Sequence, residues 1–134
     1  MDPESTPKAL GSAKVQAEPL LACLPDLERA AQAGDPSLAS AAVQRFRDAA
    51  RESGLLINFN WGEWQDEARK LLEDPRRLNK AGLEDISRLL TTCIRKERFV
   101  EGQLEELVSC GQLLRVVRRL QDLSRAARGP GFGT

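Results

Sequence analysis

Apolar residues recur at intervals of three and four positions along most of the chain, which is the spacing of one face of an α-helix. The strongest case is the segment 82–97, where the apolar side chains cover one arc and Arg88 and Arg95 fall on the opposite side. Comparable patterns cover residues 20–33, 36–53, 61–74, 103–110 and 112–126. Asp35 and Pro36 form a predicted N-cap and first helical residue, and glycines stand at several other boundaries. The pattern therefore predicts an all-α fold, a compact irregular or orthogonal bundle of five or six helices with flexible termini.

The segments outside this periodicity set the expected domain limits. Residues 1–18 mix proline, serine and charged side chains without an apolar stretch, so we expect a flexible tail and not a signal peptide. Residues 127–134 hold three glycines and one proline, which favours a second flexible tail after the last helix. The run 55–59, LLINF, has β-like character but no hairpin partner, so we expect an extended buried connector. A single helical domain is thus predicted over residues 19–126.

Composition excludes several classes of function. The chain of 134 residues carries 20 lysines and arginines against 20 acidic residues, so no overall basic field attracts nucleic acid or an anionic membrane. Histidine is absent, which removes histidine-based triads and histidine metal ligands. Cys23, Cys93 and Cys110 lie far apart and form no metal-binding pair, so we expect no catalytic residue, no cofactor and no metal. Reduced thiols favour a cytoplasmic protein, and no apolar run reaches the ~20 residues that span a membrane.

Trp61 and Trp64 allow two interpretations. The two rings share one helical arc with Ala68 and two leucines, which favours packing in the core. The alternative is a platform on which a ligand stacks. Cys93 lies in a similar apolar arc, where a buried thiol is inert, and the chain offers no histidine to activate it.

The arginines of the last helix are the best candidates for contact with a partner. Arg115, Arg118 and Arg119, the basic face, lie at positions i, i+3 and i+4 and therefore share about one helical turn. Three interpretations stay open: a solvated surface that complements the helix dipole, a contact with nucleic acid, or a contact with an acidic protein. The region resembles a helix-turn-helix only poorly, because Leu107 stands where a small residue is usual and Gln112 replaces an apolar one.

A second cluster, formed by Arg95, Arg98 and Glu101, surrounds Phe99 between two predicted helices. We expect Arg98 and Glu101 to form an ion pair that fixes the bend between these helices. Phe99 would then fill the core, and Gly102 would allow close approach of the helices. The alternative is a site for a small anionic ligand or substrate at the same three charged side chains. The structural role is favoured, because exposed arginines usually find local carboxylates.

Two stretches, INFNWGEWQDEARKLLEDPRRL and DISRLLTTCIRKERFVEGQLEELVSCGQLLRVVRRL, resemble an uncharacterised bacterial family, a domain of unknown function found in small proteins. The resemblance covers roughly residues 55–123, and its most specific part is the R-x-x-R-F-x-E-G block. Asn60 stands where the family tends to have Asp, and Gln103 stands where many members carry His. The resemblance implies a bacterial cytoplasmic protein and brings no activity with it. The matching positions are Phe59, Trp61, Trp64, Leu89, Leu90, Thr91, Arg95, Arg98, Phe99, Glu101, Gly102, Leu104, Gly111, Arg118, Arg119 and Leu120.

Three hypotheses for function follow from these patterns. The first is a non-enzymatic helical protein that acts as an interaction or regulatory module and binds another protein. The first alternative is a nucleic-acid-binding protein, including a DNA-binding one, that uses the basic face of the last helix. The second alternative is an enzyme or binder of a small anionic ligand at the cluster of Arg95, Arg98 and Glu101. We expect no association with a membrane, and the oligomeric state stays open.

Overall fold

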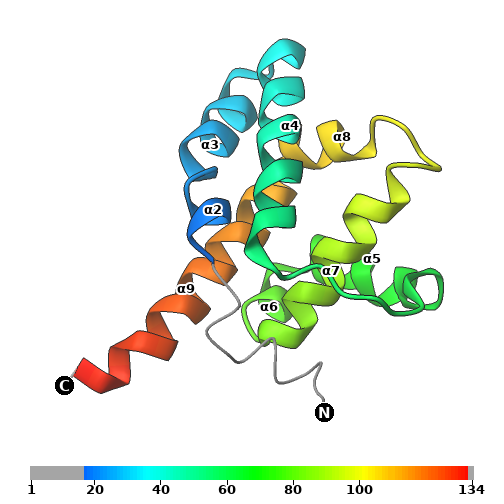
Figure 1. Cartoon of the computed structure of the whole chain (residues 1–134). Coiled ribbons are helices and arrows are strands. Elements are labelled where there is room, and N and C mark those ends of the chain that lie inside the picture. The colour runs from blue at the N-terminus through cyan, green and yellow to red at the C-terminus, as the bar shows by residue number, and fades with distance from the viewer. Residues whose placement is uncertain (1–16, 133–134) are drawn as a thin grey trace.

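Figure 1 shows the computed structural model of the chain, which describes the backbone of residues 17–132 and the side chains of residues 17–126. Most of the predicted N-terminal tail, together with residues 133–134, lies outside the described residues. The predicted all-α class is confirmed, since the described residues contain helices and no strand. The elements are α2 (Glu18–Leu21), α3 (Leu24–Ala33), α4 (Pro36–Ser53), the 3-10 helix η1 (Trp61–Trp64), α5 (Gln65–Glu73), α6 (Pro75–Leu78), α7 (Leu83–Lys96), α8 (Gln103–Ser109) and α9 (Gln112–Phe132).

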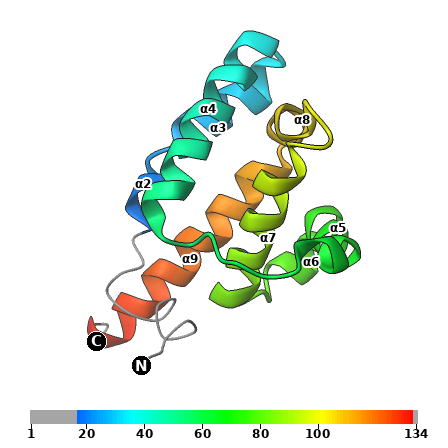
Figure 2. The same cartoon turned by 45° about the vertical axis from the view of Figure 1, so that its right-hand side comes forward.

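The helix α9 is the centre of the arrangement. It contacts α2, α3, α5, α6, α7 and α8, whereas α4 packs mainly against α2, α3 and α8. Figures 1 and 2 show α3 and α4 side by side, and in Figure 1 α9 passes obliquely behind α4, as in the predicted irregular bundle. In both views the C-terminal turns of α9 extend beyond the rest of the bundle.

The hydrophobic core collects the apolar arcs of these helices. Phe46 of α4 is fully buried and stands among buried alanines of the same helix. Leucines and valines of α8 and α9 meet it, and burial of this apolar surface is the main source of stability. The largest fully buried side chains are Phe46, Leu20, Leu27, Leu55, Leu78, Ile86, Leu89, Leu90, Leu104, Leu113, Leu120 and Val108.

The predicted start of α4 is confirmed in detail. The side chain of Asp35 accepts a hydrogen bond of 2.9 Å from the backbone N–H of Ser37, and Pro36 is the first helical residue. The same bond, together with one from the Ser37 hydroxyl, lowers the pKa of the Asp35 carboxyl. The side chain of Asp35 thus fixes the position at which α4 begins.

The helix α9 differs from the prediction at its C-terminus. It continues to Phe132, six residues beyond the expected end at residue 126, and passes through Gly129 and Pro130. The ring of proline holds φ at a helical value and removes one backbone donor, while glycine lowers helix propensity by about 1 kcal/mol. These effects weaken a helix without forcing the chain out of it, and flexibility of this end stays a prediction.

The run 55–59 connects α4 to η1 without regular secondary structure, as predicted, but the predicted burial holds only for Leu55, and Asn58 is exposed. Leu55 is fully buried, and its backbone N–H donates to the Ser53 hydroxyl at 3.1 Å. The backbone N–H of Ile57 donates to the hydroxyl of Thr91 in α7 at 3.0 Å. Two side-chain hydroxyls therefore satisfy backbone donors that a strand partner would otherwise bind, and they position the following η1 against α7.

Candidate functional site

The junction between α7 and α8 is built around one carboxylate that the sequence reading did not single out. Glu97, the residue after α7, accepts hydrogen bonds of 2.9 Å from the backbone N–H groups of both Gly102 and Leu104. These donors belong to the start of α8, where backbone N–H groups have no partner within the helix. A carboxylate is favourable there because of its charge as well as its lone pairs. Glu97 therefore caps α8 and sets its position relative to α7.

Gln103 completes the junction from the other side. Its side-chain Nε2 donates to the backbone carbonyl of Cys93 at 2.7 Å and to the carboxylate of Glu97 at 3.4 Å. Gly102 has φ of 93°, a left-handed conformation that favours glycine. A Cβ at Gly102 would meet no atom within 4 Å, so the predicted role in close helix approach is wrong. The glycine is needed for the backbone turn.

The charged cluster predicted at this junction does not form its expected ion pair. Arg95, Arg98 and Glu101 are exposed, and none of the three side chains has a hydrogen bond or ion pair to another described residue. The predicted Arg98–Glu101 pair is therefore absent from the described part of the chain. The bend is held by Glu97 instead, because Glu97 reaches the free donors of α8 directly.

Phe99 is the largest departure from the sequence prediction. Its side chain is 74% exposed, so the expectation that it fills the core is wrong. The helix α7 ends at Lys96, and Phe99 lies in the turn that follows, where the helical arc of α7 no longer applies. Val100 beside it is 47% exposed.

The exposed Phe99 is supported by a second aromatic ring from a distant part of the chain. The rings of Trp61 and Phe99 lie 5.8 Å apart between centroids with an interplanar angle of 33°. We call Trp61, Phe99 and Val100 the apolar tip. The loops that carry it, η1 and the turn between α7 and α8, lie on the side of the molecule away from α3 (Figure 1).

The two tryptophans of the W-x-x-W pattern have different surroundings. Trp64 packs against the core and meets Phe59 edge-to-face, with ring centroids 6.1 Å apart. Trp61 is partly exposed and belongs to the apolar tip. Both tryptophans are half-buried, and the predicted core packing holds in part for Trp64, which packs against the core. Trp61 lies outside the core because the segment forms a 3-10 helix and the α-helical arc does not extend to it.

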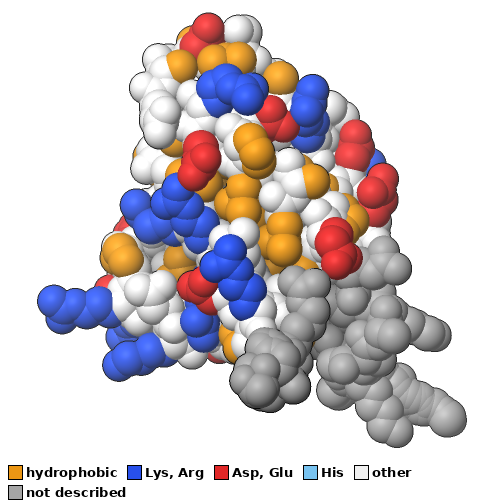
Figure 3. Space-filling model, turned by 90° about the vertical axis from the view of Figure 1, so that its left-hand side faces the viewer, with side chains coloured by type: hydrophobic (Ala, Val, Ile, Leu, Met, Phe, Trp, Pro, Cys, Tyr) orange, Lys and Arg blue, Asp and Glu red, His pale blue; other side chains and the backbone are white. Residues whose placement is uncertain are grey.

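Two of the three arginines of the basic face bind within the protein. Arg118 forms an ion pair with Glu28 of α3, and the Nε–H of Arg119 donates to the backbone carbonyl of Ala81 at 2.9 Å. Arg115 is exposed and has no partner among the described residues. Figure 3, which views the side of α2 and α3, shows basic and acidic side chains interspersed around hydrophobic ones. Arg118 and Arg119 thus connect α9 to α3 and to the segment before α7, and the Arg118 side chain stays half exposed.

The first half of the helix α9 buries one face and exposes the other. Gly111, with φ of 84°, separates α8 from α9 in a left-handed turn. The first half of α9 then buries Leu113, Val116, Val117 and Leu120 in the centre of the bundle. The opposite face of this half of α9 is exposed at Arg115 and Arg118, so the helix is amphipathic, with one face in the core and one at the surface.

The described residues offer few groups for catalysis or metal binding. Burial raises the pKa of the Cys93 thiol to about 12, and it also raises the pKa of Cys23. Cys110 is exposed. Within residues 17–126, no group of three or more Cys, Asp or Glu side chains could hold a metal ion. No helix in the described part of the chain is long and apolar enough to cross a membrane.

The fold and its surface define a small all-α domain whose distinguishing feature is an exposed aromatic tip on a firmly capped helix junction. The chain belongs to the family of unknown function DUF6508, whose model matches residues 14–126. The match extends beyond the stretch 55–123 that carries the resemblance in the sequence, and it includes α2, α3 and α4. Comparison with curated proteins and with solved structures gives no significant match.

The roles of Glu97 and Phe99 were not predicted, although the sequence around each residue contains a signal that indicates its role. Glu97 is an acidic residue at the otherwise basic end of α7. It lies five residues before Gly102, close enough for its carboxylate to accept hydrogen bonds from the first backbone N–H groups of the next helix. Phe99 falls outside the apolar arc of 82–97, which is a reason to expect it at the surface.

Proposed function

We propose that this chain is a non-enzymatic protein-interaction module of the bacterial cytoplasm, and that its partner protein docks on the apolar tip. The observation that carries the proposal is the exposure of Phe99, which is 74% exposed, whereas the other large apolar side chains among the described residues are mostly covered. Exposed apolar clusters on soluble proteins mark interaction sites. Aromatic side chains are also prominent among the residues that dominate binding energy.

The apolar tip is held in place before any partner arrives. Glu97 and Gln103 fix the ends of the turn that carries Phe99, and the ring of Trp61 lies against the ring of Phe99. Side chains that are already ordered lose less entropy on binding. A rigid tip therefore favours docking into a preformed pocket of the partner.

The charges next to the tip indicate the chemistry of the partner. Arg95 and Arg98 are exposed and unpaired among the described residues, and they precede Phe99 by four and one positions. Arginine beside an aromatic ring is a common combination in protein interfaces. The partner surface that fits is an apolar pocket with carboxylates on its rim. Glu101 on the other side of Phe99 would keep the binding specific by repelling a wholly acidic surface.

Nucleic-acid binding by the basic face has weaker support. Arg118 and Arg119 are engaged with Glu28 and with the carbonyl of Ala81, which leaves Arg115 as the arginine of the face with no partner in the described residues. Affinity for nucleic acid grows with the number of phosphates that basic side chains neutralise. One free arginine on a chain of zero net charge provides little of this attraction.

The test is affinity capture on the folded chain, with and without nuclease, using the wild type, Phe99→Ala and Arg115→Ala. The proposal predicts that a specific protein is retained after nuclease treatment and by the Arg115→Ala variant, and is lost with Phe99→Ala. Loss on nuclease treatment or with Arg115→Ala would support the nucleic-acid alternative. Retention by Phe99→Ala would place the contact elsewhere and contradict the proposal.

A further inference from the structure

A shallow groove of about 360 Å³ lies beside the apolar tip, between the start of α4 and the start of α8. Pro36 and Ala39 of α4 provide apolar surface on one side of it. Val100 belongs to the apolar tip and also lines the groove, so the two features are adjacent on the surface of the molecule. The apolar tip therefore has an open recess directly next to it.

The α8 side of the groove is acidic. Glu101, Glu105 and Glu106 line it, and none of these side chains has a hydrogen bond or ion pair to another described residue. None of the described residues that line the groove is basic. The groove therefore fits a docking element that combines an apolar side chain with positive charge, because complementary charges steer and select a partner.

The apolar tip of the same chain has this combination. Phe99 is 74% exposed, and Arg95 and Arg98 precede it with side chains that are exposed and unpaired among the described residues. Arg98 and Glu101 stand three positions apart in the chain, yet their side chains form no ion pair with each other. One chain therefore holds both halves of a complementary contact, a basic aromatic tip and an acidic groove.

We infer that the partner of the apolar tip is a second copy of this chain, in a symmetric dimer in which Phe99 of each copy enters the groove of the other. The inference rests on the proposed function, because it uses the same tip. A two-fold dimer makes every contact twice, so the arginines of each tip face Glu101 and Glu105 of the other copy. The zero net charge of the chain adds no overall repulsion between the copies.

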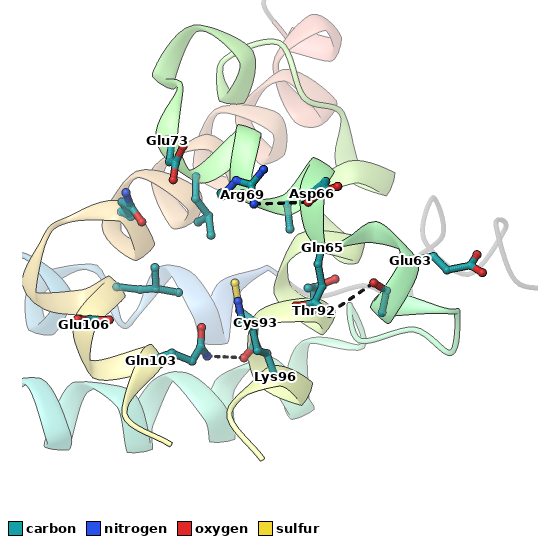
Figure 4. A pocket seen from close by; sticks show the side chains of 15 residues that line it. Glu63, Gln65, Asp66, Arg69, Glu73, Thr92, Cys93, Lys96, Gln103 and Glu106 are labelled. Carbon is teal, nitrogen blue, oxygen red and sulfur yellow. Dashed lines mark hydrogen bonds and ion pairs between the residues drawn. The ribbon is translucent and has the colours of Figure 1, made fainter. Parts of the chain in front are cut away.

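Both halves of the contact are held in position within the single chain. Glu97 accepts hydrogen bonds from the backbone of Gly102 and Leu104, which fixes the start of α8 at the groove. Gln103 lines the groove and also the larger cavity drawn in Figure 4, where its side chain donates to the backbone carbonyl of Cys93. Groups that are already ordered lose less entropy when the copies associate.

Sedimentation velocity of the purified chain, at micromolar to millimolar concentration, tests the inference. One tip and one groove make a small contact compared with the about 800 Å² per partner of a typical stable complex, so we expect a weak dimer. The sedimentation coefficient of the wild type should rise with concentration, and Phe99→Ala should stay monomeric throughout. A wild type that is monomeric at millimolar concentration, or equal dimerisation of Phe99→Ala, would overturn the inference.

Charge reversal tests the arrangement of the two copies. Arg98→Glu and Glu101→Arg each bring like charges together twice, so we expect each variant alone to dimerise about tenfold more weakly, by two weak ion pairs together. An equimolar mixture of the two variants should regain the wild-type affinity, because each reversed charge then meets its opposite on the other chain. A mixture that associates no better than the separate variants would overturn the arrangement.

The matched controls are Arg115→Glu and Glu52→Arg, which change the net charge equally at exposed positions outside the tip and the groove. Each control should dimerise as the wild type does, and circular dichroism confirms that all variants are folded. A chain that stays monomeric but still loses its captured protein with Phe99→Ala would refute the dimer and leave the proposed function standing. A monomeric chain whose captured protein is retained by Phe99→Ala would refute both.

Discussion

At the scale of single residues, Phe46 and Phe99 show how position decides what an aromatic side chain does. Phe46 lies in the middle of α4 and is fully buried in the core. Phe99 lies just after α7 and is 74% exposed, resting on one face against Trp61. The first residue stabilises the fold, and the second leaves apolar surface exposed to solvent.

Replacing each of these phenylalanines by alanine should therefore have very different effects on stability. Phe46→Ala should lower the free energy of unfolding by about 3–5 kcal/mol, because it leaves a cavity in the core. Phe99→Ala should lower it by about 1 kcal/mol, the contribution of an aromatic pair. Urea unfolding of the two variants measures both values. A cost for Phe99→Ala close to that of Phe46→Ala would mean that Phe99 is a core residue.

The three cysteine thiols should differ in reactivity, because they differ in burial. Cys23 and Cys93 are buried and Cys110 is exposed, and burial raises the pKa of the Cys93 thiol from 9.0 to about 12. Only the thiolate reacts, so an aromatic disulfide reagent at neutral pH should modify one thiol per folded chain quickly. Cys110→Ser should remove this fast phase. Fast reaction of two or more thiols in the folded chain would contradict the burial.

The pKa of Cys93 also predicts a pH dependence of stability. Between pH 9.0 and about 12 the unfolded thiol loses its proton while the folded thiol retains it. The free energy of unfolding should therefore fall as the pH rises through this window. Cys93→Ala should flatten that fall in urea titrations at pH 8 and pH 10. An equal fall in the variant would assign the effect to other groups.

At the scale of elements, the helices could be predicted from the sequence, whereas the structure of the junction between α7 and α8 could not. The apolar arcs, Asp35 at the start of α4 and the glycines at helix ends were sufficient to locate the main helices, because these signals are local. The direction of the turn after α7 depends on Glu97 reaching the donors of α8, a contact between helices that no local pattern specifies. The same holds for Trp61 and Phe99, which are distant in sequence and adjacent in space.

The cap on α8 can be tested by comparing Glu97→Ala with Glu101→Ala. Glu97→Ala removes the acceptor for two backbone donors, so it should lower the free energy of unfolding by about 1–2 kcal/mol. Glu101 is exposed and unpaired among the described residues, so its replacement should change stability by less than about 0.5 kcal/mol. Urea unfolding distinguishes the two. If the two variants lowered the free energy of unfolding equally, the result would contradict the cap by Glu97 and favour the predicted ion pair of Arg98 and Glu101.

The attachment of α9 can be tested with Arg119→Ala and Arg115→Ala. Arg119 donates to the carbonyl of Ala81, and its loss should leave that carbonyl without its partner and cost about 1–2 kcal/mol of stability. Arg115 is exposed without a described partner, so its loss should cost less than about 0.5 kcal/mol. A stability of Arg119→Ala equal to that of the wild type would show that its side chain is free for another role.

At the scale of the whole molecule, the apolar tip is the main departure from a surface of balanced charges. The chain has zero net charge, and Arg118 and Arg119 of the basic face bind within the bundle. The apolar tip, by contrast, exposes Phe99 on a junction that Glu97 holds in place. An exposed aromatic side chain on a chain of zero net charge favours specific docking of a protein over broad electrostatic binding.

The most direct test of this account places a photoreactive benzoyl-phenylalanine at position 99 and, as a control, at Gln44, an exposed position of α4. Illumination of cells that express each variant is followed by nuclease treatment and by detection of the cross-linked chain. The account predicts a discrete protein adduct from position 99, unchanged by nuclease and absent from position 44. Equal adducts from both positions, or an adduct at position 99 that nuclease removes, would contradict a protein-docking role for the apolar tip.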